Sequence, residues 1–161
     1  MTMKRIYVNE EYCIACRLCE IHCQVQHSQS KKIIKAFREE DPRAMPRLLI
    51  EEEGPLSFAM QCRHCEEPRC VEACITGAMH YHESSGAILC DEDKCVGCWM
   101  CIMVCPFGAI RRDMVGRKVA SKCDLCYGEK MPVCVAHCPN EALTFVEVPA
   151  SAQRSGKGNR E

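Results

Sequence analysis

Residues 95–106 read CVGCWMCIMVCP, and residues 13–23 read CIACRLCEIHC. Both stretches space four cysteines as C-x2-C-x2-C-x3-C, and a proline follows the fourth cysteine of the first stretch. Two more groups, at residues 62–74 and 123–138, keep the first and last spacings but lengthen the middle one to x4 or x7. The chain therefore repeats one four-cysteine unit four times, and this repeat decides the fold.

The four groups contain sixteen of the seventeen cysteines in the 161-residue chain. In chain order they are Cys13, Cys16, Cys19 and Cys23; Cys62, Cys65, Cys70 and Cys74; Cys95, Cys98, Cys101 and Cys105; and Cys123, Cys126, Cys134 and Cys138. Cys90 stands outside the groups, and we interpret it as a small buried side chain at the end of a strand. A regulatory thiol is the alternative for this residue.

Three cysteines on one tight loop can bind three corners of a [4Fe–4S] cube, while the fourth cysteine of such a run ligates a neighbouring cluster. Two groups thus hold two clusters between them, and four groups predict four [4Fe–4S] clusters. Four-cysteine zinc sites are the main alternative, but zinc needs only two CxxC pairs separated by a longer segment. A disulfide scaffold fits poorly, because the chain begins MTMKRIYVNEEY without an apolar export signal. We therefore expect a cytoplasmic protein.

The composition excludes several classes of function. Aromatic residues make up only 6% of the chain, so we expect bound clusters to supply much of the cohesion of the fold. A net charge of −1 gives no sign of nucleic-acid binding, and the apolar runs are too short to span a bilayer. GxGxxG and Walker A motifs are absent, and no nucleophile is evident, so we predict electron transfer rather than catalysis.

β-branched and aromatic residues gather in five short segments that we expect to be strands: residues 5–9, 78–82, 86–90, 108–111 and 142–148. A short helix is expected from the third to the fourth cysteine of each group. The insertion between the first two groups predicts a helix over residues 30–40, with Ser30 as N-cap, and an edge strand over 47–53. The apolar face of this expected helix would carry Ile33, Ile34 and Phe37.

Other side chains lie close to the cysteines in sequence. Three histidines are expected to be exposed loop residues, with tuning of a cluster as the alternative: His22, His64 and His137. Trp99 is expected to shield a cluster from water. Four neighbouring apolar residues are expected to pack in the core between modules, with a docking patch as the alternative: Met100, Ile102, Met103 and Val104. Five cations are expected either to offset cluster charge or to lie on the surface: Arg17, Arg63, Arg69, Lys94 and Lys122.

The order of the groups and their x4 and x7 variants resemble the four-cluster iron–sulfur subunits of the dimethyl-sulfoxide-reductase and formate-dehydrogenase type. Within that type the chain is more similar to the ferredoxin-like protein associated with carbon monoxide dehydrogenase (CooF-like). The runs that carry this similarity are FAMQCRHCEEPRC, ITGAM, DEDKCVGCWMCIMVCPFGAI and KVASKCDLC. The resemblance covers residues 4–148.

The resemblance implies an α+β fold of two pseudo-symmetric, bacterial-ferredoxin-like modules wrapped around four cubane clusters. One domain over residues 1–148 would contain an outer module (about 1–56 plus 115–148) and an inner module (about 57–114), and 149–161 would be a disordered tail. The implied ligand sets are Cys13, Cys16, Cys19 and Cys138; Cys123, Cys126, Cys134 and Cys23; Cys62, Cys65, Cys70 and Cys105; and Cys95, Cys98, Cys101 and Cys74. Some relatives lack the third cysteine of the third group and carry a [3Fe–4S] cluster, so Cys101 favours four cubanes.

The resemblance also implies a subunit that relays low-potential electrons between two proteins. Carbon monoxide dehydrogenase is the preferred donor, with a flavin-dependent NAD(P) oxidoreductase or a hydrogenase as acceptor. The alternatives are the small subunit of a tungsten aldehyde oxidoreductase or formate dehydrogenase, a free polyferredoxin carrier, and a zinc-held interaction module. Relatives at membranes often carry extra C-terminal helices, which this sequence does not show, so no direct membrane insertion is expected.

Overall fold

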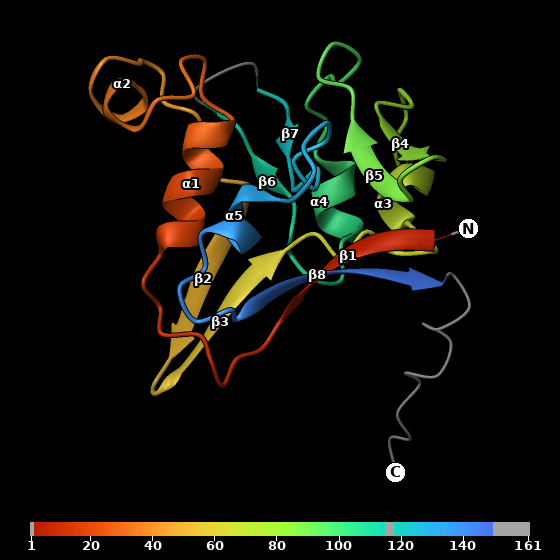
Figure 1. Ribbon diagram of the computed structural model, residues 1–161. Helices are drawn as coiled ribbons and strands as arrows, with labels where there is room; N and C mark the ends of the chain where they lie inside the picture. The colour runs from red at the N-terminus through yellow and green to blue at the C-terminus, as the bar shows by residue number, and fades with distance from the viewer. Residues whose placement is uncertain (1, 115–117, 150–161) are drawn as a thin grey trace.

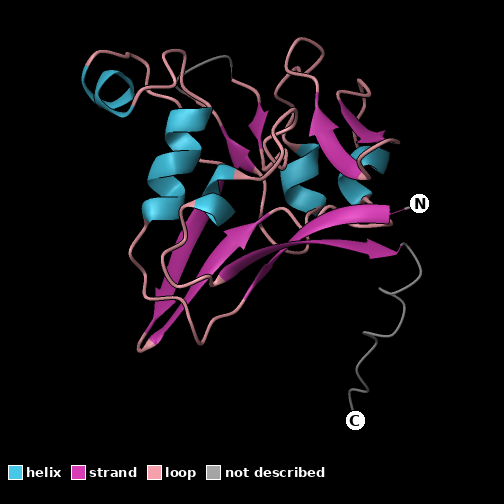
Figure 2. Cartoon of the chain, in the orientation of Figure 1, coloured by secondary structure: helices cyan, strands magenta, loops and turns pink. Residues whose placement is uncertain are grey.

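The computed structural model describes residues 2–114 and 118–149 (Figures 1 and 2). Within this part of the chain, the strands pair as two-stranded antiparallel ribbons rather than as one sheet. β1 (Thr2–Val8) pairs with β8 (Leu143–Pro149), with Ile6 opposite Phe145. The two ends of the described chain therefore lie together (Figure 1). β8 reaches Pro149, and residues 150–161 of the expected tail lie outside the described residues.

Three further ribbons lie between these ends in sequence. β2 (Leu48–Glu53) and β3 (Leu56–Gln61) form a hairpin, and β3 was not among the expected strands. β4 (Met79–His82) pairs with β5 (Ala87–Cys90), as expected. β6 (Arg111–Arg112) pairs with β7 (Ala120–Ser121), so the segment expected at 108–111 becomes a strand only at its last residue.

Each cysteine group contributes one short helix, which confirms the expectation for the segments around the third and fourth cysteines. These helices are α1 (Leu18–Gln26), α3 (Arg69–Glu72), α4 (Met100–Val104) and α5 (Val133–Ala136). α1 packs against α5, and α3 packs against α4. The first and fourth groups therefore lie together, as do the second and third.

The insertion folds differently from the expectation. Its helix, α2 (Ile33–Arg38), starts after Lys32, so Ser30 is not the N-cap. The Ser30 hydroxyl instead accepts a hydrogen bond from the Lys32 N–H within the preceding turn, at 3.4 Å. Ala36 is the buried residue of α2, whereas Ile33 and Ile34 are 51% and 65% exposed. Ile33 and Ile34 therefore do not pack in the core.

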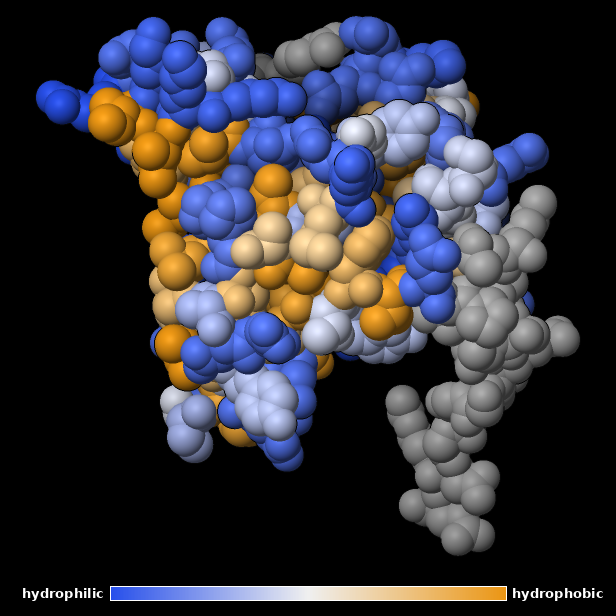
Figure 3. All heavy atoms as spheres, viewed as in Figure 1, coloured by the Kyte–Doolittle hydropathy of each residue, from blue (hydrophilic) through white to orange (hydrophobic). Residues whose placement is uncertain are grey.

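Small side chains make up more than half of the core. Six of its buried hydrophobic residues are cysteines and seven are alanines, beside larger residues such as Ile50, Ile88 and Leu143. Figure 3 shows hydrophobic residues across the middle of the face over α1 and α5, with hydrophilic residues along its upper rim. In the described part of the chain, no helix has the length and apolar character that crossing a membrane requires.

Candidate metal centres

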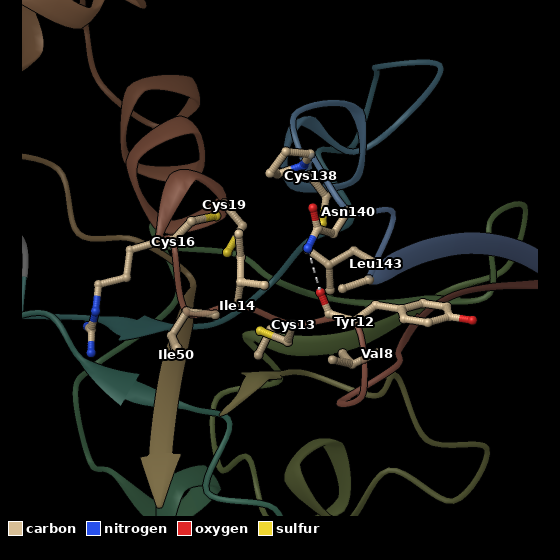
Figure 4. A pocket seen from close by; sticks show the side chains of 14 residues that line it. Val8, Tyr12, Cys13, Ile14, Cys16, Cys19, Ile50, Cys138, Asn140 and Leu143 are labelled. Atoms are coloured by element: carbon tan, nitrogen blue, oxygen red, sulfur yellow. Dashed lines mark hydrogen bonds between the residues drawn. The ribbon is translucent and has the colours of Figure 1, made fainter. Parts of the chain in front are cut away.

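A cavity of about 370 Å³ opens beside the start of α1 (Figure 4). Its cysteines are Cys13, Cys16 and Cys19, from the first group, and Cys138, from the last. Val8, Ile50 and Leu143 supply apolar walls. The side-chain amide of Asn140 donates to the Tyr12 carbonyl at 3.2 Å, which joins the two cysteine-bearing segments. We call these four cysteines the first site.

A second cavity of about 330 Å³ lies among the second and third groups. Four cysteines of the second and third groups line it: Cys74, Cys95, Cys98 and Cys101. We call these four the fourth site, because two further sites lie between it and the first. Trp99 forms part of its wall, as expected of a residue that shields the site. Cys90 lies at the end of β5, as expected, but it is half-buried rather than buried, and it also lines this cavity. Burial, and after it the neighbouring Cys95, raises the pKa of the Cys90 thiol to about 12.

The remaining eight cysteines form two more sets. Burial raises the pKa of the Cys134 thiol, and the adjacent Cys23 and Cys126 raise it further. Cys123 lies within electrostatic range of both Cys134 and Cys62. We group it with Cys23, Cys126 and Cys134 as the second site, following the ligand set that the sequence resemblance implies. Burial likewise raises the pKa of the Cys70 thiol to about 11, with further contributions from its set partners. The third site consists of Cys62, Cys65, Cys70 and Cys105.

The four sites follow one another through the molecule. Cys19 of the first site and Cys23 of the second belong to one hydrophobic cluster. Cys62 of the third site packs against the cluster that contains Cys123 of the second. Cys105 of the third site packs against the cluster that contains Cys101 of the fourth. The order of the sites is therefore first, second, third and fourth.

Exposure differs along this series. Cys16 of the first site and Cys98 of the fourth are exposed. All four cysteines of the second site are buried, and those of the third are partly buried. The series thus begins and ends at the surface and passes through the interior.

The repeat extends to the backbone of the cysteine loops. In each group the residue before the second cysteine has a left-handed backbone: φ is 53° at Ala15, 47° at His64, 67° at Gly97 and 59° at Leu125. The N–H groups of His64 and Leu125 donate to the sulfur of the first cysteine in their groups, at 3.5 and 3.4 Å. These loops direct sulfurs and N–H groups toward one centre, which suits thiolate ligands.

The residues present fit iron–sulfur clusters. A single zinc ion draws four sulfurs to about 2.3 Å, which leaves no cavity between them. Across residues 2–114 and 118–149, no three His, Cys, Asp or Glu side chains converge closely enough to hold one metal ion. The first and fourth sites instead have cysteines around a wider cavity. Four cysteines per site match the ligand set of a [4Fe–4S] cluster.

Two polar residues near the sites are buried. His64 has no exposed surface, so the expectation of an exposed loop residue is wrong for it. His137 is exposed as expected, and its ring stacks on that of His22 at 3.6 Å. Lys122 is 2% exposed, whereas the other four cations singled out in the sequence lie on the surface: Arg17, Arg63, Arg69 and Lys94. No pattern in the sequence separates Lys122 from these four.

An ion-pair network beside the second site could not be read from the sequence. The Asp124 carboxylate accepts from Arg47 at 2.9 Å and from His27 at 3.2 Å. Arg47 also donates from its backbone N–H to the Cys23 sulfur at 3.2 Å. The network joins the end of α1, the insertion and the last cysteine loop, and hydrogen bonds from both cations hold the pKa of Asp124 below its usual range despite burial.

The apolar residues of α4 do not all pack in the core. Met100 is 44% exposed and Met103 is 77% exposed, so the expected core packing is wrong for both. α4 has five residues, and its buried position is taken by Cys101. Ile75 and Val96, near other cysteines of the fourth site, are also exposed. Apolar side chains therefore reach the surface around this end of the series.

Comparison with known proteins agrees with this geometry. Residues 55–148 match the family described as 4Fe-4S dicluster domain. The chain is 38% identical to an iron-sulfur protein of Rhodospirillum rubrum, over 90% of this chain and 83% of that protein. It is 32% identical to the electron transport protein HydN of Escherichia coli K12, over 96% of this chain and 94% of that one.

A solved structure shares the fold. A chain of the active site complex BamBC of benzoyl coenzyme A reductase superimposes with a TM-score of 0.52 and 21% identity, over 92% of this chain and 79% of that chain. At this identity the likeness concerns the fold alone. Together with the sequence matches and the sixteen grouped cysteines, it leads to one conclusion: this chain is an iron–sulfur protein that belongs to the 4Fe-4S dicluster domain family.

Proposed function

We propose that the chain is a cytoplasmic, non-catalytic electron-transfer subunit that relays low-potential electrons through four [4Fe–4S] clusters. The observation that carries this proposal is the series of four adjoining cysteine sites, with an exposed cysteine at each end site and buried or partly buried cysteines at the two middle sites. A relay needs this arrangement, because electrons must enter and leave at the surface without side reactions on the way. The name of the relative HydN, an electron transport protein, supports the same role.

Each site has four cysteines to hold one cluster, and a bound cluster supplies reversible one-electron transfer. The other residues of the sites serve three purposes. Backbone N–H groups such as those of Arg47 and Met79 donate to the sulfurs of Cys23 and Cys74, which stabilises their negative charge. Apolar walls at the first site exclude water. Paired contacts between α1 and α5, and between α3 and α4, support two modules that share ligands.

The chemistry of the surface around the end sites supports docking to proteins at both ends. Tyr12 and Ile14, which line the first site, are 56% and 61% exposed. Val96 and Met103 are 65% and 77% exposed near the fourth site. Exposed apolar side chains that gather at one place mark interaction surfaces. One end would face a catalytic oxidoreductase and the other a second redox protein.

Carbon monoxide dehydrogenase is the catalytic partner that we propose, with a flavin-dependent NAD(P) oxidoreductase or hydrogenase at the other end. This choice rests on the resemblance of the cysteine-bearing runs to the ferredoxin-like protein associated with that enzyme. Anaerobic purification from the native organism tests it. Co-elution of a nickel–iron carbon monoxide dehydrogenase is expected. A tungsten or molybdenum enzyme in its place would keep the relay and change the partner, and elution alone would indicate a free carrier.

A matched pair of variants tests the ligand sets. Cys98→Ala removes a ligand of the fourth site, so iron should fall from about sixteen atoms per chain to about fifteen if a [3Fe–4S] cluster remains, or to about twelve if the site is empty. Cys90→Ala removes a cysteine from the same cavity that is not a proposed ligand, and all the iron should remain. Equal iron loss in both variants would refute the assignment. A colourless wild-type protein with stoichiometric zinc would refute the clusters themselves.

A further inference from the structure

A buried chain of hydrogen bonds connects the second and third sites. The Lys122 ammonium donates to the Cys123 carbonyl at 2.7 Å and to the Ile88 carbonyl. The Ile88 N–H donates in turn to Nδ1 of His64 at 2.9 Å. Lys122, Ile88 and His64 are 2%, 1% and 0% exposed. A link without water therefore runs from the loop of Cys123 to the loop that carries Cys62 and Cys65.

The contact with Ile88 fixes the state of His64. A backbone N–H can only donate, so Nδ1 must accept, and the imidazole is neutral with its hydrogen on Nε2. Nε2 is buried and has no hydrogen-bond partner among the described residues. Buried N–H groups almost always have an acceptor. Because His64 lies between Cys62 and Cys65, the acceptor that fits is sulfur of the third site.

The Lys122 ammonium is buried, and among the residues that the structure describes no carboxylate neutralises its charge. Its hydrogen bonds in the described structure go to two backbone carbonyls, and no described carboxylate forms an ion pair with it. A buried cation needs compensation by a nearby negative charge. Thiolates near Lys122 can supply that charge, since Lys122 directly precedes Cys123 and lies within electrostatic range of Cys70 and Cys90.

We propose that Lys122 and His64 form a buried electrostatic bridge that stabilises the reduced state of the clusters at the second and third sites together. This inference rests on the proposed function, because it requires clusters at both sites. Lys122 supplies a positive charge to both clusters, and His64 supplies an N–H donor to the third site alone. Positive charge and hydrogen bonds to sulfur both raise the reduction potential of a cluster.

The size of the effect follows from Coulomb's law. Two unit charges about 12 Å apart at an effective permittivity of about 20 interact strongly enough to change an equilibrium constant about tenfold. Removing the charge of Lys122 should therefore change the redox equilibrium constants of two of the four clusters about tenfold. For a one-electron couple this lowers each of the two midpoint potentials by about 59 mV. The potentials of the first and fourth sites should change less.

The chain contains a closely matched control. Lys94 directly precedes Cys95, just as Lys122 directly precedes Cys123, but Lys94 is 66% exposed and paired with Asp91 at 3.0 Å. We would compare Lys122→Met with Lys94→Met by potentiometric titration of the purified holoprotein, followed by EPR. Lys122→Met should shift two midpoint potentials. Lys94→Met should change no redox equilibrium constant by more than about twofold, because water screens an exposed charge. Lys122→Arg keeps the charge and should restore both potentials.

Iron content distinguishes failure of the bridge from failure of the proposed function. Wild-type protein with fewer than four clusters refutes the function. Lys122→Met with full iron and unchanged potentials refutes the bridge, and so does an equal shift in Lys122→Arg, which would indicate a structural role. If Lys122→Met does not assemble, His64→Phe provides the test: it should lower one potential only. Unchanged potentials in His64→Phe would then overturn the proposal.

Discussion

Gly97 provides a sharp test of how the cysteine loops are built. It occupies the position before the second cysteine of the third group, where the other three groups have Ala15, His64 and Leu125 in the same left-handed conformation. The conformation therefore does not require glycine at this position. A methyl group on Gly97 would, however, lie 2.5 Å from the Lys118 carbonyl oxygen. We predict that Gly97→Ala weakens the fourth site because of this contact.

Gly77 allows the two effects to be separated. It has the same φ of +67°, and a methyl group there would meet no atom within 4 Å. Gly77→Ala should cost about 1–2 kcal/mol from the left-handed backbone alone. In Gly97→Ala the oxygen must move from 2.5 Å to at least 3.4 Å, the start of ordinary contact. Overpacking of this kind costs a further amount of about 1–3 kcal/mol.

The assay is the loss of cluster absorbance in urea under anaerobic conditions, together with iron content. Gly97→Ala should lose absorbance at lower urea than Gly77→Ala and should contain about twelve iron atoms per chain rather than about sixteen. Gly77→Ala should keep all its clusters. If the two variants lose the same stability and keep the same iron, the contact with Lys118 does not constrain the loop, and the reasoning is refuted.

Two other predictions concern stability. Asp124→Asn leaves Arg47 and His27 without their shared carboxylate. Because the Asp124 side chain is only 24% exposed, we expect the free energy of unfolding to fall by about 2 kcal/mol. If the whole loss appears in the rate of unfolding, the clusters should bleach about 30-fold faster in denaturant. Glu39→Gln, at an exposed pair with Lys35, should change that rate less than about twofold, and equal rates in the two variants would contradict the prediction. Chelation of iron should abolish cooperative unfolding, measured by circular dichroism, because the core left behind consists largely of alanine and cysteine. An apo-protein that still unfolds cooperatively would contradict this prediction and show that the polypeptide core alone stabilises the fold.

The sequence predicted the repeating features of the molecule and missed the singular ones. The helices near the third and fourth cysteines were found because all four groups share one spacing. Strands such as β4 and β5 were found because their β-branched and aromatic content is local. β3 was missed because LSFAMQ has little of that content, and its partner β2 stabilises it as a strand. Pairing of this kind depends on context rather than on local propensity.

The buried polar residues were missed for a different reason. Lys94 and Lys122 are indistinguishable in sequence, since each directly precedes the first cysteine of a group. Their environments differ because β5 lies beside Lys122 and offers it the Ile88 carbonyl, whereas Lys94 follows a surface turn and pairs with Asp91. His64 is likewise in a loop by sequence and in the interior by packing. Burial at such positions is set by contacts between segments far apart in the chain.

These two kinds of residue divide the work of the protein. The repeated cysteines would hold clusters that are chemically alike, so they alone would give four similar sites. The two partners set the direction of electron flow, and the potentials of the sites set the energy of the electron at each step between them. Differences in potential must come from residues that the repeat does not copy, and Lys122, His64 and the Asp124 network all lie at the second and third sites. The interior of the series, rather than its exposed ends, is therefore where this chain can set the energy of an electron that passes through it.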